Sequence, residues 1–131
     1  MAKNNKQPKR IVVKLGTNLL TSGKDSLDLE TIGDIFTQVA AVKASGIEVL
    51  IVTSGAVAAG RDSLSRTSGK DKLQRGTVAY RQALAALGQP QLMMTFEQLF
   101  AEHNVEVAQA LISRGDLQSR SRYLNVRNTL D

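Results

Sequence analysis

Two short, nearly continuous apolar runs lie early in the chain, at 10–15 and 48–52, and each is followed by a glycine turn. Their β-branched residues predict strands that are buried on both faces. Between them, apolar residues recur at helical spacing over about 29–45, with Asp28 as the expected N-cap and Gly46 as the expected stop. Strand, helix and strand in this order favour parallel pairing with a right-handed crossover. The two glycine turns should therefore lie at the same edge of the sheet.

Beyond the second turn, the pattern predicts further helices and one more strand. We expect a surface loop over 61–75, which either connects two elements or covers a site as a lid. The fold class is α/β, with a largely parallel sheet flanked by helices in three layers. The other expected elements are an alanine-rich helix from Ala56, a helix over 76–87, another opened by Pro90, a third strand over 105–113, and a last helix capped by Asp116.

The charge of the chain changes this interpretation little. Of 17 basic residues, four lie in the first ten positions, which hold no acid, so the rest of the chain has 13 basic and 12 acidic residues. Residues 1–9 are therefore expected to be a basic flexible tail and 10–131 the folded part. A nucleic-acid partner is not expected, because the basic surplus is confined to the tail and only 4% of residues are aromatic.

The sequence offers no sign of a membrane partner or of export. No apolar run approaches the roughly 20 residues that a membrane span needs, and the basic N-terminus lacks the apolar stretch of a secretory signal. There is no cysteine, which is consistent with a cytoplasmic protein.

The candidate chemistry lies in the two turns. Lys14 stands at the carboxyl end of the first strand, just before Gly16; it is either a surface lysine or part of a site at the sheet edge. Ser54, Gly55 and Ala56 open the alanine-rich helix, whose unpaired N–H groups and positive dipole end favour an anion. One turn could take a phosphate and the other a carboxylate. A carboxylate that attacked a phosphoryl group would need no general base, because it is already ionised at pH 7.

Other chemistries find less support. Gly55 and Gly60 have the spacing of a phosphate-binding P-loop, but Arg61 and Asp62 replace its lysine and hydroxyl residues. The four residues between the glycines are also helix formers, whereas a P-loop is unwound there. No G-x-G-x-x-G motif follows either strand, and no serine–histidine–aspartate arrangement is visible around Ser54.

Several stretches of this chain resemble the amino acid kinase family. The similarity runs almost continuously from Arg10 to the last residue. The stretches that carry it are VVKLGT at 12–17, IVTSGAVAAGR at 51–61, QALAALGQ at 82–89, AQAL at 108–111 and RYLNVRNTL at 122–130.

The resemblance implies a phosphotransferase of proline biosynthesis. Its substrates would be ATP, with Mg²⁺, and L-glutamate, whose γ-carboxylate would become γ-glutamyl phosphate. The resemblance implies that Lys14 is the catalytic residue and that it contacts the phosphoryl group being transferred. It further implies that Gly16 and Thr17 line the phosphate side, and that Ser54, Gly55 and Ala56 hold the glutamate.

Kinase domains of this family are longer than this chain. We therefore expect residues 10–131 to be the N-terminal part of such a domain, inactive or nearly so alone, and the full-length form to be a homo-oligomer. The alternative is a non-catalytic module that binds a carboxylate or a phosphate, or pairs with a partner chain through its open sheet edge.

Overall fold

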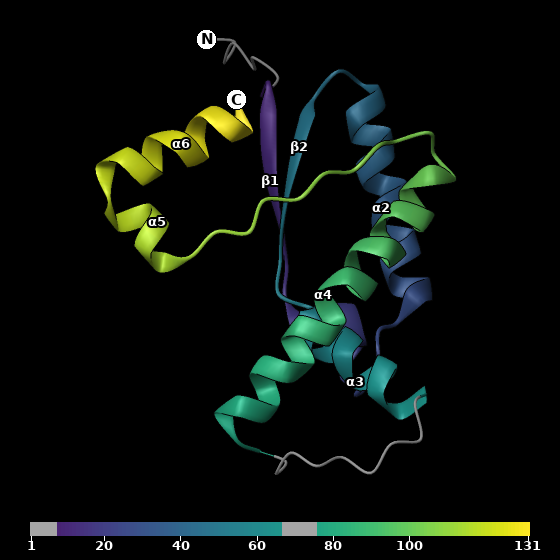
Figure 1. Ribbon diagram of the computed structural model, residues 1–131. Coiled ribbons are helices and arrows are strands. Elements are labelled where there is room, and N and C mark those ends of the chain that lie inside the picture. Colours follow the sequence, from purple (N-terminus) through teal and green to yellow (C-terminus); the bar gives the residue numbers. More distant parts are fainter. Residues whose placement is uncertain (1–7, 67–75) are drawn as a thin grey trace, which may run out of the picture.

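The computed structural model describes residues 8–66 and 76–131. These residues form a parallel sheet with flanking helices (Figure 1). Helices α2 and α4 lie on one side of the sheet and α6 on the other. The elements are β1 (Arg10–Leu15), α1 (Thr17–Thr21), α2 (Leu29–Ala44), β2 (Glu48–Thr53), α3 (Ala56–Arg66), α4 (Val78–Ala101), α5 (Arg114–Gln118) and α6 (Arg120–Leu130).

The two predicted strands pair in parallel, as expected. Their register runs from Arg10 opposite Glu48 to Leu15 opposite Thr53. Side chains alternate along β1, so that Val13 and Leu15 pack into the core while Val12 points outward and is 63% exposed. The predicted α/β class with a parallel sheet and flanking helices is thus confirmed, and both glycine turns lie at the carboxyl ends of the strands.

Helix α2 begins and ends where its capping residues predict. The Asp28 carboxylate accepts a hydrogen bond from the Thr31 N–H at 3.1 Å, which satisfies one of the unpaired donors of the first turn. At the other end Gly46 follows the helix with φ +86°, a left-handed conformation that glycine adopts without strain.

The pKa of Asp28 lies below its ordinary value because the Ser22 hydroxyl and the Thr31 N–H donate to the carboxylate, with Lys24 adding attraction. A lowered pKa in the folded state stabilises the protein above the unfolded value of about 3.9. We expect this stabilisation to be lost as the pH falls through the folded pKa.

The Asp28→Asn variant keeps a capping oxygen but does not titrate. Its thermal midpoint, followed by circular dichroism between about pH 2 and pH 6, should therefore vary less steeply than that of the unmodified protein. Parallel pH curves would show that Asp28 does not contribute to the dependence.

Three phenylalanines hold α2 against α4. The Phe36 ring stacks on Phe100 with centroids 3.9 Å apart and meets Phe96 edge-on at 4.7 Å. Such contacts add to the burial of the rings themselves. The core built around them comprises Leu15, Leu20, Ile32, Phe36, Val39, Ala59, Leu92, Phe96 and Phe100.

Helix α4 is one helix where the sequence predicted two. Pro90 lies inside it, although a proline removes one helical hydrogen bond and crowds the preceding turn. The helix continues because Leu84 and Gly88 before Pro90 are buried on the same face as Leu92 and Phe96 after it. The prediction that a new helix begins at Pro90 was therefore wrong.

The prediction of a loop over 61–75 was also wrong in part, because α3 continues to Arg66. Residues 67–75, where a lid was considered, lie outside the described residues, as do residues 1–7 of the expected basic tail.

The expected third strand at 105–113 does not form. Val105 and Val107 pack against the core, but Leu111 and Ile112 are exposed, and the segment crosses the sheet without joining it (Figure 1). Asp116 is not the cap of the next helix; that role belongs to Ser113, in a capping box with Asp116. Within the described residues, no helix has the length and apolar character needed to cross a membrane.

Candidate functional site

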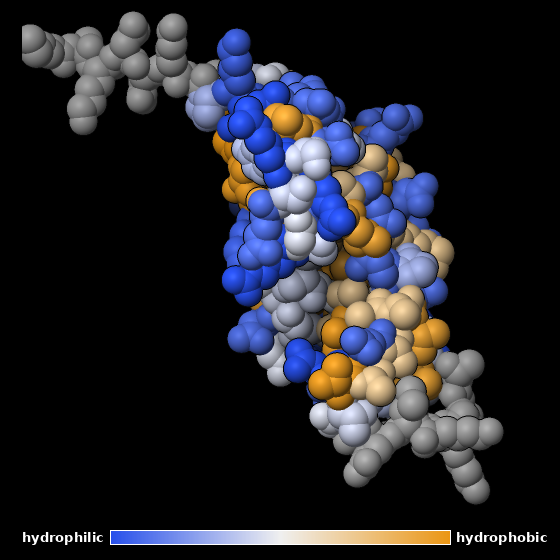
Figure 2. Space-filling view, turned by 60° about the vertical axis from the view of Figure 1, so that its left-hand side comes forward, coloured by the Kyte–Doolittle hydropathy of each residue, from blue (hydrophilic) through white to orange (hydrophobic). Residues whose placement is uncertain are grey.

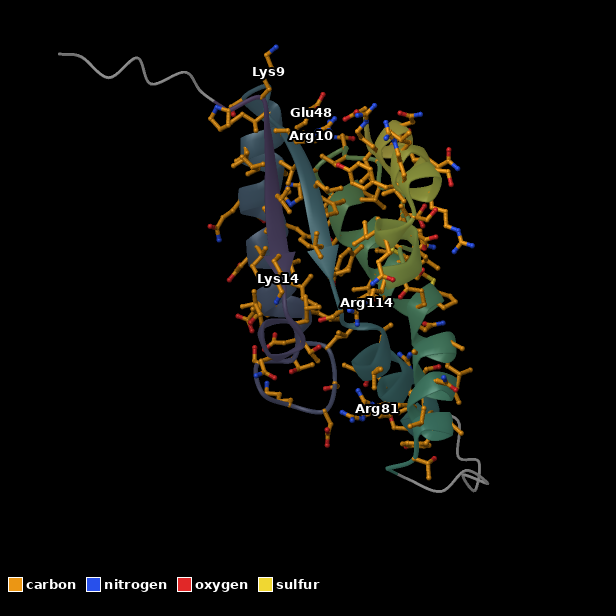
Figure 3. All side chains as sticks on the ribbon, turned by 90° about the vertical axis from the view of Figure 1, so that its left-hand side faces the viewer. Lys9, Arg10, Lys14, Glu48, Arg81 and Arg114 are labelled. Carbon is orange, nitrogen blue, oxygen red and sulfur yellow. The ribbon has the colours of Figure 1, made fainter. Side chains whose placement is uncertain are left out.

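The side chain of Lys14 lies over the backbone of the first glycine turn, at Gly16. Gly16 follows β1 and is the N-cap residue of the short helix α1. The ammonium Nζ of Lys14 lies 3.6 Å from the point where a Cβ on Gly16 would stand. The side chain of Lys14 is exposed. Figure 3 places it toward the carboxyl end of β1, away from Lys9 and Arg10 at the other end. A positive charge is therefore available to a ligand at this edge of the sheet.

Thr17 joins the two turns directly. Its Oγ1 lies 3.2 Å from the Ser54 Oγ and donates to the Ser54 carbonyl oxygen at 3.3 Å. Lys14 is paired in register with Val52, two residues before Ser54, and all three residues are exposed. The structure thus confirms that the Lys14 turn and the Ser54 turn share one edge of the sheet.

The second turn opens α3. The Gly55 carbonyl accepts the first helical hydrogen bond, from the Ala59 N–H at 3.1 Å. The N–H groups of the first helical residues, from Ala56 onward, have no acceptor within the helix. Their partial positive charge, and the absence of an acidic residue in the first turn, favour an anionic ligand next to the Ser54 hydroxyl.

Leucine side chains from two other helices fix the position of the second turn. A Cβ on Gly55 would stand 2.7 Å from Leu20 Cδ1 and 3.2 Å from Leu92 Cδ1, so a larger residue here would force these leucine side chains to shift. Both leucines are almost fully buried. The core therefore supports the turn at Gly55, while the neighbouring Ser54 is exposed.

Close contact between α3 and α4 fixes the start of α3. A Cβ on Gly88 would stand 1.8 Å from the Ala56 carbonyl oxygen, and one on Gly60 would stand 2.0 Å from the Leu84 carbonyl oxygen. Backbone meets backbone at this crossing. Gly88 belongs to a stretch that carries the family resemblance, but its positioning role was missed, because that role depends on which helices cross.

Two exposed arginines lie in the half of the molecule toward the carboxyl ends of the strands. Figure 3 labels Arg81 of α4 and Arg114 of α5 in this half, away from Lys9 and Arg10 at the other end. Sequence reasoning did not single out either arginine, because they follow no motif and are brought to this half by the tertiary fold.

The described residues supply no ready metal centre. Across 8–66 and 76–131, no group of three or more histidine, cysteine, aspartate or glutamate side chains could hold an ion. Mg²⁺ is commonly bound through nucleotide phosphates with only one or two protein carboxylates. None of the described residues is assigned to it.

A parallel βαβ unit with a glycine turn after each strand is the arrangement of α/β proteins that bind a ligand at the carboxyl ends of their strands. The sequence matches the model of the amino acid kinase family over residues 9–131, and the chain belongs to that family.

Individual curated relatives show which members of the family this chain is similar to. The chain is 50% identical over 123 residues to a glutamate 5-kinase of Dehalococcoides mccartyi. The corresponding identities are 47% for that of Shewanella amazonensis and 44% for that of Pelobacter propionicus. These matches cover 93–94% of this chain but only 31–32% of each relative. The chain thus spans about a third of the length of the curated relatives it matches.

Proposed function

We propose that this chain supplies part of a kinase that transfers a phosphoryl group from ATP to the γ-carboxylate of L-glutamate. The observation that carries the proposal is the Thr17–Ser54 contact, which brings the Lys14 turn and the start of α3 to one place. The relatives named glutamate 5-kinase support the choice of glutamate as the acceptor. The product would be γ-glutamyl phosphate, an intermediate of proline biosynthesis.

In this proposal each of the two turns binds one of the two anionic substrates. Lys14, with Gly16 and Thr17, faces the phosphates, and Ser54, Gly55 and Ala56 hold the glutamate. A carboxylate oxygen forms a bond to the γ-phosphorus while the bond from that phosphorus to the bridging oxygen of ADP breaks. No proton has to be removed from the nucleophile. The protein therefore acts by alignment and by placing the Lys14 charge where negative charge develops.

Magnesium bound with ATP would neutralise phosphate charge in the same step.

The chain would form one part of a longer kinase domain. Residues 1–9 precede the domain, and 10–131 form the N-terminal part of a kinase domain that is a homo-oligomer in its full-length form. Because the chain spans about a third of its relatives, we expect it to show little or no transfer alone.

The test is to complete the domain. The chain is fused to the part of the Dehalococcoides mccartyi relative that follows the matched residues, and ADP formation is measured with ATP and Mg²⁺. We expect ADP release that depends on L-glutamate and is absent with the chain alone. A folded fusion that releases no ADP in response to glutamate would refute the proposal.

A non-catalytic binding module is the second candidate. It is favoured because Ser54 and the start of α3, which would bind the anion, both belong to this chain and lie within the described residues. Calorimetric titration of the chain alone with L-glutamate, and separately with ATP, distinguishes the two. Binding by the chain together with an inactive but folded fusion would favour the binding module.

A further inference from the structure

One polar atom beside the second turn is buried without a partner. The hydroxyl oxygen of Thr53 is almost fully shielded from solvent, yet it has no hydrogen-bond partner among the described residues. On the face of the molecule that Figure 2 shows, apolar residues lie beside polar ones, and such exposure is ordinary in proteins. A buried hydroxyl without a partner is the rarer observation, because nearly all buried polar groups are hydrogen-bonded.

The strand places this hydroxyl on the core side of the sheet. Thr53 is the last residue of β2 and lies opposite Leu15, which is 2% exposed. Side chains alternate along a strand, so Thr53 shares its face with Ile51, which packs against the core. Valine has nearly the same shape and would fill this position without burying an unpaired hydroxyl. Packing alone therefore does not explain why the residue is a threonine.

The position of Thr53 in the chain connects its hydroxyl to the candidate site. The residue that follows is Ser54, which begins the turn proposed to hold the acceptor. Thr53 as a whole is partly exposed although its hydroxyl oxygen is buried, so other atoms of the residue face the surface at this edge. Side-chain rotamers lie about 120° apart. One rotamer step about the Cα–Cβ bond therefore exchanges the directions of the hydroxyl and the methyl group while the backbone stays in place.

We propose that Thr53 is a further specificity-determining residue of the acceptor turn, whose hydroxyl turns out of the core and donates a hydrogen bond to the carboxylate of the bound acceptor. The proposal rests on the proposed function, because it takes the Ser54 turn to hold L-glutamate. In the bound state the methyl group occupies the buried direction, which suits the apolar core. Acceptor binding is thus favoured twice, by a hydrogen bond to a charged group and by the removal of an unpaired polar atom from the core.

The test compares three variants, each made in the chain alone and in the fusion with the rest of the Dehalococcoides mccartyi relative. Thr53→Val keeps the shape of the side chain and removes the hydroxyl, whereas Thr53→Ser keeps the hydroxyl and removes the methyl group. Thr37→Val is the matched control, because the Thr37 hydroxyl lies on α2 and already donates to the Gly33 carbonyl oxygen at 3.0 Å. Urea unfolding of the chains measures stability, and steady-state assays of the fusions give kcat and the KM for L-glutamate.

We expect Thr53→Val to raise the urea midpoint of the chain, because no unpaired hydroxyl remains buried. In the fusion it should raise the KM for L-glutamate by about tenfold or more, the usual effect of losing a hydrogen bond to a charged group, with a smaller change in kcat. Thr53→Ser should recover most of this loss. Thr37→Val should change the KM less than threefold and should not raise the midpoint.

An active Thr53→Val fusion with an unchanged KM overturns the proposal. A lower urea midpoint for the Thr53→Val chain also overturns it, because the hydroxyl would then be paired in the free protein. An unmodified fusion that folds but releases no ADP in response to glutamate refutes the proposed function and this inference with it. The activity of the unmodified fusion thus separates the failure of the proposed function from the failure of the role given to Thr53.

Discussion

Replacing Lys14 by alanine lowers glutamate-dependent ADP formation by the fused enzyme by about 100-fold or more. Removal of one preorganised group that stabilises transition-state charge typically costs 10²–10³-fold in rate. Lys14 is the described cation whose Nζ reaches over the Gly16 turn, so no neighbour on β1 replaces it. The rate constant kcat should fall more than the KM for glutamate rises, because Ser54 and the start of α3 remain in place.

Two controls accompany this prediction. Lys9→Ala removes a lysine next to the opposite end of β1 (Figure 3) and should leave the rate unchanged. Lys14→Arg keeps the charge but replaces a compact ammonium by a planar group, so it should restore only part of the rate. Steady-state assays of the three variants, each checked for folding by circular dichroism, decide the matter. Full activity of the Lys14→Ala enzyme would rule out the role given to this residue.

Replacing Gly88 by alanine destabilises the fold by about 3 kcal/mol or more, at the upper end of what overpacking costs. The added Cβ would stand 1.8 Å from the Ala56 carbonyl oxygen and 2.3 Å from the Gly60 nitrogen. Both are backbone atoms of α3, so no side chain can rotate out of the way. The helices must separate, and the loss is large against the 5–15 kcal/mol that stabilises a typical protein.

Gly33→Ala is the matched control, since Gly33 lies inside α2 and a Cβ added there would have nothing within 4 Å. Alanine has the better helix propensity by about 0.5–1 kcal/mol, so this variant should gain stability. Urea unfolding of the three proteins measures both effects. Similar midpoints for the two variants would show that α3 and α4 do not meet as closely as described.

The sequence predicted those elements whose signals are local. Asp28 and Gly46 bound α2 because capping and a left-handed turn depend on a few neighbouring residues. The parallel pairing of β1 and β2 followed from the helix between them. The shared edge of the Lys14 and Ser54 turns was therefore predictable from the order of the elements alone.

The elements that were mispredicted depend on distant contacts. Pro90 reads locally as a helix start, but burial on both sides of it keeps α4 continuous. Residues 105–113 are apolar enough for a strand, yet a strand exists only where another strand offers its ladder. The five-residue helix α1 was not expected at all; burial of Leu20 compensates for a length at which a helix is marginal.

The contact between the Thr17 and Ser54 hydroxyl groups affects the direction in which each hydroxyl hydrogen can point. Each hydroxyl carries one hydrogen and can accept from the other, and their oxygens are 3.2 Å apart. When Thr17 donates to either oxygen of Ser54, the hydrogen of the Ser54 hydroxyl is free to turn outward toward an acidic ligand. This rotation would let Ser54 donate to a negatively charged group without any movement of the backbone.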